Sequence, residues 1–125
     1  MEKTNNVELT YKAIDAIVRS NKEARDAGNY IGLVLNGQMC LNHVWTLVSH
    51  GIEQESLYRK FEARRLNELL ASGERGKNGI AEVEAKATDY YREWQKATQT
   101  VNLLYEMTNL AKKLAGDVDK NLKAT

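Results

Sequence analysis

A long heptad repeat in the carboxyl-terminal third of the chain constrains the fold more than any other feature of the sequence. Apolar and small residues alternate there at steps of three and four, the pattern of a helix that packs lengthwise against other helices. The repeat consists of Ile80, Val83, Ala87, Tyr90, Trp94, Ala97, Val101, Leu104, Thr108, Ala111 and Ala115. It predicts one continuous helix over 80–115, about 50 Å long at roughly 1.5 Å per residue. Such a helix needs a partner along its length, because a domain of this size is narrower than that.

The apolar face of this predicted helix widens toward its carboxyl end. Leu103, Met107, Leu110 and Leu114 form a second row beside the heptad positions, and a wide face can contact two neighbours at once. The sequence favours a chain that folds back and covers the repeat, with self-association through the surplus apolar surface as the alternative. For that alternative, the predicted interface with another copy or partner consists of Tyr90, Trp94, Val101, Leu104, Met107, Leu110 and Leu114.

Glycine marks the predicted ends of the other helices, since the 125-residue sequence contains no proline. Helices are predicted over 7–27, 29–50 and 52–71, because each of these amphipathic runs is followed by a glycine. Residues 72–79 hold three glycines and no apolar side chain, so they are predicted to form a loop, and the tail 117–125 is expected to fray. The expected fold is therefore all-α, a single domain built as a bundle of about four helices.

Residues 30–41 leave one alternative open. Asn36-Gly37 stands between two apolar runs and is a two-residue signal for a β-hairpin. A mostly buried helix is favoured, because Asn36, His43 and His50 recur every seven residues, away from an apolar helical face. That predicted apolar face contains Ile31, Val34, Leu41, Trp45 and Val48.

Composition indicates a folded protein of the cell interior. Apolar residues make up 42% and charged residues 28% of the chain, outside the range of disordered proteins. The net charge of +1 gives no strong attraction to nucleic acid as a whole. A single cysteine, Cys40, and an amino terminus without a secretory signal favour the cytoplasm, or the host cytoplasm if the protein is encoded by a phage. The most apolar stretch, 30–48, is interrupted by polar residues, so no membrane partner is expected.

No constellation for catalysis or for a metal stands out. Cys40, His43 and His50 have helical spacing, but a closed zinc site takes four ligands, so packing and surface hydrogen bonding are favoured for all three. No glycine elbow or strand presents a nucleophile to a base. The Gly-Lys pair at 76–77 lacks the hydroxyl and the strand of a phosphate-binding P-loop. We therefore expect neither enzyme activity nor a cofactor.

A local excess of positive charge does stand out between Arg59 and Lys77, with six basic and three acidic residues. The basic residues are Arg59, Lys60, Arg64, Arg65, Arg75 and Lys77. Phosphate contacts give affinity without sequence preference, and Tyr58 is a stacking platform nearby, so this segment is a candidate track for single-stranded nucleic acid. The competing interpretation, a charged helix face that only solvates the bundle, stays open.

Between Glu55 and Leu114 the order of features resembles the bacteriophage recombination-mediator family, small helical proteins that help load a recombinase onto single-stranded DNA. The matching features are the basic helix Tyr58–Leu70, the glycine and charge loop Ser72–Lys77, and the long helix with Tyr90-Tyr91, Trp94 and Leu104-Tyr105-Glu106-Met107. The resemblance implies oligomerisation through helices, contact with single-stranded DNA by the six basic residues above, and protein partners in a recombination or replication complex. Residues 1–51 carry no part of it.

Two functions from different classes follow. The first is a phage-type accessory protein of DNA recombination or replication, which binds single-stranded nucleic acid and partner proteins as a helical oligomer. The second is a non-enzymatic protein-interaction module, such as a phage inhibitor of a host defence complex or an assembly subunit, that uses the surplus apolar row of the last helix.

Overall fold

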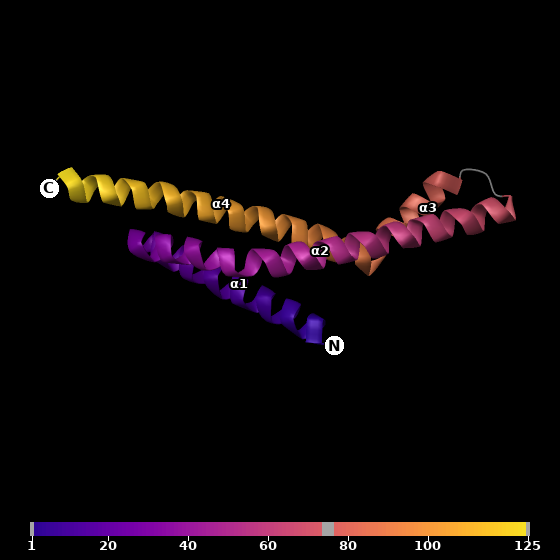
Figure 1. Cartoon of the computed structure of the whole chain (residues 1–125), viewed down its shortest axis with the longest axis horizontal. Coiled ribbons are helices and arrows are strands. Elements are labelled where there is room, and N and C mark those ends of the chain that lie inside the picture. Colours follow the sequence, from indigo (N-terminus) through magenta and orange to yellow (C-terminus); the bar gives the residue numbers. More distant parts are fainter. Residues whose placement is uncertain (1, 74–76, 125) are drawn as a thin grey trace. The chain divides into compact units, whose positions relative to one another are not determined.

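The residues that the computed structural model describes form four α-helices (Figure 1). They are α1 (Glu2–Asp26), α2 (Tyr30–Ser72), α3 (Lys77–Lys86) and α4 (Asp89–Ala124). The structure describes residues 2–73 and 77–124, and side chains over 6–73 and 79–117. No strand occurs within these ranges, which confirms the all-α prediction and gives residues 30–41 as helix rather than hairpin.

The helices form two compact units, Met1–Leu47 with Thr100–Thr125, and Val48–Gln99. Both α2 and α4 contribute one part to each unit. The sequence predicted a single domain over 1–125, and that assignment stays a prediction.

In the first unit, α1 and the carboxyl-terminal half of α4 both pack on the beginning of α2. Gly28, at φ 67°, ends α1 in the left-handed conformation that glycine adopts without strain, and the Asn29 amide donates to the Ala24 carbonyl at 2.7 Å. Asn29 then caps α2, because its side-chain oxygen accepts a hydrogen bond from the Gly32 amide at 3.0 Å. This short connection turns the chain back, so that α1 runs antiparallel to the start of α2 (Figure 1).

The core of the first unit lies between these three helices. Its buried apolar side chains are Ile14, Ile17, Ala24, Leu33, Cys40, Leu47, Val101, Leu104 and Ala111. The Thr108 hydroxyl of α4 shares its one proton between the Leu104 carbonyl of α4 at 2.8 Å and the Gly37 carbonyl of α2 at 3.2 Å. A Cβ at Gly37 would overlap the Cβ of Ala111. The glycine therefore lets the two helices approach closely at this point.

In the second unit, the carboxyl-terminal half of α2 packs against α3 and the start of α4. Tyr58, Leu69, Ala81, Ala85 and Ala97 are buried there. Three contacts give the direction of these segments: His50 with Glu93, Tyr58 with Tyr91, and Arg65 with Glu84. As the residue number rises along α2, the number of its contact residue falls, so α2 runs antiparallel to the segment formed by α3 and the start of α4. The predicted fold-back across the glycine loop is present in this unit.

The prediction of two helices over 29–50 and 52–71 was wrong, because α2 continues through Gly51. Gly51 is buried, and a Cβ at this position would lie 3.4 Å from the Cβ of Ala97 and 4.0 Å from Trp94. The glycine thus serves close packing against α4 instead of ending a helix. The predicted loop bounds 72–79 were also wrong, since α2 still includes Ser72 and α3 already begins at Lys77.

The prediction of one continuous helix over 80–115 was wrong as well. The heptad repeat is divided between α3 and α4, with a break at Ala87 and Thr88. The Thr88 hydroxyl donates to the Ala85 carbonyl at 2.7 Å and accepts from the Tyr91 amide at 3.4 Å, so one threonine terminates α3 and caps α4. At the other end, α4 runs on to Ala124, past the expected end at Ala115 and through most of the tail predicted to fray.

The face of α2 that was predicted to be apolar and buried is exposed in part. Ile31, Leu41 and Trp45 are exposed in the single chain, whereas Val34 and Val48 are half-buried. Ile31 is 66% and Trp45 75% exposed, whereas Asn36 is buried, with its amide donating to the Ser20 hydroxyl at 3.3 Å. Both sides of the first half of α2 therefore carry apolar residues, and α1 and α4 cover only one side.

Candidate interaction surfaces

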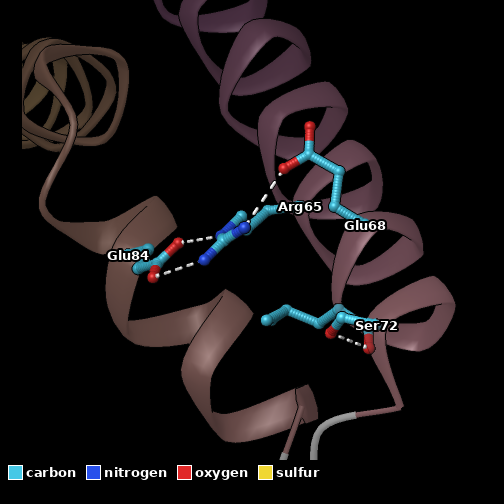
Figure 2. Close-up of polar contacts among 5 residues, drawn as sticks. Arg65, Glu68, Ser72 and Glu84 are labelled. Carbon is cyan, nitrogen blue, oxygen red and sulfur yellow. Dashed lines mark hydrogen bonds and ion pairs between the residues drawn. The ribbon is translucent and has the colours of Figure 1, made fainter.

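The predicted basic segment lies on the second half of α2, and Arg65 in this segment is held by carboxylates. Its Nε and Nη2 donate to the two oxygens of Glu84 on α3, the latter at 3.3 Å, and its Nη1 donates to Glu68 at 3.2 Å (Figure 2). Hydrogen bonding to Glu84, and then to Glu68, raises the pKa of the Arg65 guanidinium. Because two carboxylates compensate the positive charge of Arg65, this guanidinium is poorly suited to bind a phosphate. Its contact with Glu84 joins α2 to α3 instead.

Arg59 is also engaged. Its guanidinium binds Glu55, one turn earlier, with Nη2 at 3.1 Å and Nε at 3.3 Å. The same group lies 5.7 Å from the centre of the Trp94 ring and 5.9 Å from that of Tyr58, within the range of cation–π attraction. Arg59 therefore covers an aromatic cluster with its charge partly compensated.

The aromatic cluster beneath Arg59 consists of Tyr58, Tyr91 and Trp94. The ring centres are 5.2 Å apart for Tyr58 and Tyr91, 5.5 Å for Tyr58 and Trp94, and 5.9 Å for Tyr91 and Trp94. Tyr58 is buried, and burial followed by the nearby Glu62 carboxylate raises the pKa of its hydroxyl. The cluster is packing between α2 and α4, so Tyr58 offers no open face on which a base would stack.

Lys60 and Arg64 are the predicted basic residues that stay open. Both are exposed, and the structure gives neither an ion pair within the described side chains, although the Arg64 guanidinium lies 5.5 Å from the centre of the Phe61 ring. Arg75 lies outside the described residues, and so does the side chain of Lys77, whose backbone begins α3. The described part of the predicted nucleic-acid surface therefore contains two uncompensated cations.

The seven residues of the predicted oligomer interface divide into three groups. Val101 and Leu104 are buried in the core of the first unit, and Trp94 is half-buried in the aromatic cluster of the second. Met107 and Leu114 are half-buried, whereas Tyr90 and Leu110 are exposed. Leu110 is 50% and Leu103 42% exposed, so the second row of α4 offers apolar surface that the chain's own helices leave open.

A larger exposed apolar surface lies on the first half of α2. Its members are Ile31, Leu35, Met39, Leu41 and Trp45. The sequence pattern predicted that Ile31, Leu41 and Trp45 lie on a buried face. It gave no prediction for Leu35 and Met39. One signal in the sequence marks the whole region: no Asp, Glu, Lys or Arg occurs between Asp26 and Glu53. A helix that is apolar all round is usually buried on every side.

Cys40, His43 and His50, the weak metal candidate, are used separately. Cys40 is fully buried, and this burial raises the pKa of its thiol. His50 lies 3.1 Å from Glu93 through Nε2 and Oε2, which joins α2 to α4 in the second unit. Within the part of the chain that the structure describes, no group of three or more His, Cys, Asp or Glu residues is placed to hold a metal ion.

Comparisons with known proteins identify no relative: no family model, no curated protein and no solved structure matches the chain. The resemblance to phage recombination mediators stays a prediction. No helix in the described ranges is long and apolar enough to span a membrane.

Proposed function

We propose that this chain is a non-enzymatic interaction protein that works as a helical oligomer, assembling through apolar helix faces that its own fold leaves open. One observation carries this proposal: in the second row of α4, Leu103 is 42% and Leu110 50% exposed, whereas the neighbouring first row is buried. Contiguous exposed apolar surface of this kind usually marks a protein interface. The charged network around Arg65, by contrast, is internally compensated.

The test of this proposal is the change in assembly mass on Leu110→Glu, measured by light scattering. Because Leu110 is half exposed in the single chain, the substitution leaves the core intact, but a carboxylate in a desolvated interface is strongly unfavourable. We expect the assembly to dissociate. Asn109→Glu, which introduces the same charge at the adjacent exposed position, is the matched control and should retain the wild-type mass. Equal masses for wild type and Leu110→Glu would refute the role of the α4 row.

A second candidate function is binding of single-stranded nucleic acid, as in the phage accessory proteins that the sequence resembles. Lys60 and Arg64 favour it, since both are exposed on α2 without a recorded carboxylate partner among the described side chains, and Arg64 lies over Phe61. Exposed cations beside an aromatic ring suit a phosphate backbone and a stacked base. An oligomer would repeat this pair of cations along a bound strand.

The nucleic-acid candidate is tested with a labelled single strand titrated at several salt concentrations. Binding should weaken as salt rises: a plot of the logarithm of the binding constant against the logarithm of the salt concentration should have a slope of about −0.7 per phosphate contact. The binding constant should fall steeply in a Lys60→Glu, Arg64→Glu double variant. Arg65 is left in place, because its reversal would break the contact with Glu84. Lys112→Glu with Lys113→Glu makes the same change in net charge at exposed positions of α4 and should bind like wild type. Absence of binding at moderate salt would remove this candidate.

A further inference from the structure

The outer face of the first half of α2 has the spacing of a helix-pairing seam. Ile31, Leu35, Gln38, Asn42 and Trp45 follow one another at steps of four, three, four and three, and all five are exposed. Alternating steps of this kind place residues in one stripe along a helix. The stripe is flanked by Met39 and Leu41, which are also exposed.

The opposite face of the same segment is already occupied. Leu33, Cys40 and Leu47 are buried there, Asn36 binds Ser20 of α1, and Gly37 contacts α4. Neither α1 nor α4 has a described contact that covers the outer stripe, since all five of its residues are exposed. The stripe thus belongs to a helix with one face packed in its own unit and the other left in solvent.

The absence of charged residues on this face indicates which kind of partner can bind it. No Asp, Glu, Lys or Arg occurs between Asp26 and Glu53, so the stripe offers nothing to pair with a charged partner. Its two polar members, Gln38 and Asn42, carry side-chain amides that both donate and accept hydrogen bonds. An amide can therefore pair with the same amide of a second copy across a two-fold axis. A single Asn within a seam of paired helices also fixes their register.

We propose that the stripe of Ile31, Leu35, Gln38, Asn42 and Trp45 is a self-association seam, on which two copies of this chain pair through α2 about a two-fold axis near Asn42. Leu35 and Ile31 pack on one side of the amides and Trp45 on the other, and the amides at the centre align the helices. The seam deepens the proposed function by naming a second copy as one partner, and it lies on α2 rather than on the α4 row.

The mass of the purified full chain in solution tests the seam. Trp45→Glu should reduce the wild-type mass two-fold, because it places a carboxylate in the seam. Trp45 is 75% exposed in the single chain, so helical content by circular dichroism should be unchanged. Val83→Glu is the matched control, since Val83 is 70% exposed on α3, and it should keep the wild-type mass.

Cross-linking gives a second measurement that does not depend on disrupting the seam. Asn42→Cys should form a disulfide-linked dimer under mild oxidation, since the two thiols meet at the two-fold axis. Val83→Cys, at another exposed position, should stay a single chain at the same concentration. Cys40 need not be replaced, because it is fully buried.

The outcomes separate the seam from the proposed function. If Trp45→Glu keeps the wild-type mass and Leu110→Glu lowers it, the seam is overturned and assembly through α4 stands. If Trp45→Glu halves the mass and Leu110→Glu leaves it unchanged, the seam stands and the role of the α4 row fails. Failure of Asn42→Cys to cross-link above the level of Val83→Cys also overturns the seam.

Discussion

At Gly37 the packing of two helices depends on the absence of a side chain. A Cβ there would overlap the Cβ of Ala111 and come within 3.0 Å of the Met107 carbonyl oxygen, which is backbone and cannot turn away. The neighbouring Thr108 hydroxyl donates to the Gly37 carbonyl. One small residue thus sets how closely α2 and α4 approach in the first unit.

Gly37→Ala should lower the free energy of unfolding by about 1–3 kcal/mol, because overpacking outweighs the gain of up to about 1 kcal/mol in helix propensity. Urea unfolding measures the change. Gly116→Ala is the control: it lies inside α4 with nothing within 4 Å of the added Cβ, so it should be stabilising by about 0.5–1 kcal/mol. A neutral or stabilising Gly37→Ala would mean that α4 does not approach α2 at this point.

The Arg65 to Glu84 pair is a second contact of this scale, and it links α3 to α2. We expect Glu84→Gln to lower the urea midpoint, since it removes the charge that two nitrogens of Arg65 contact. Glu82→Gln, whose partner Lys86 lies on the same helix, should lower it less. An equal effect of both substitutions would show that Arg65 contributes nothing to joining the two helices.

The ends of the helices could be predicted from the sequence where they depend on neighbouring residues. They could not be predicted where a contact with a distant part of the chain determines whether the helix continues. Gly28, which terminates α1, and Asn29, which caps α2, act on residues within a few positions of themselves. Gly51 satisfies the same sequence rule, but it packs against Ala97, 46 positions away, and the helix continues. Three of the five residues on the predicted buried face of α2 are exposed instead. Asn36, predicted to lie away from that face, is buried, and its amide donates to Ser20 of α1, a partner that periodicity cannot reveal.

At the scale of the elements, the break between α3 and α4 contains no glycine or proline. Only the capping residue, Thr88, marks it in the sequence. Thr88→Ala should lower the free energy of unfolding by about 1 kcal/mol, because the Tyr91 amide loses its acceptor. Thr88→Ser should retain most of the wild-type value. Thr98→Ala, which removes a hydroxyl bonded inside α4, should be neutral or slightly stabilising. Equal effects at positions 88 and 98 would contradict the capping role.

At the scale of the whole molecule, the structure supports the apolar faces as interaction surfaces more than the basic segment that the sequence predicted. The sequence singled out six basic residues, but Arg59 and Arg65 are compensated by carboxylates. The partner of Arg59 lies four residues earlier on the same helix, whereas Glu84, the partner of Arg65 on α3, is brought near only by the fold. Three of the five apolar residues predicted for a buried face of α2, Ile31, Leu41 and Trp45, lie exposed instead. A chain that leaves this much apolar surface uncovered is expected to cover it by assembling.

The most direct test of assembly is the molar mass of the wild-type chain by sedimentation equilibrium across a wide concentration range. The chain alone has a mass of 14.2 kDa. We predict a mass that approaches a whole multiple of this value as concentration rises. A constant mass of 14.2 kDa up to the highest concentration would contradict the account, because the exposed faces of α2 and α4 would then have no second copy to cover them.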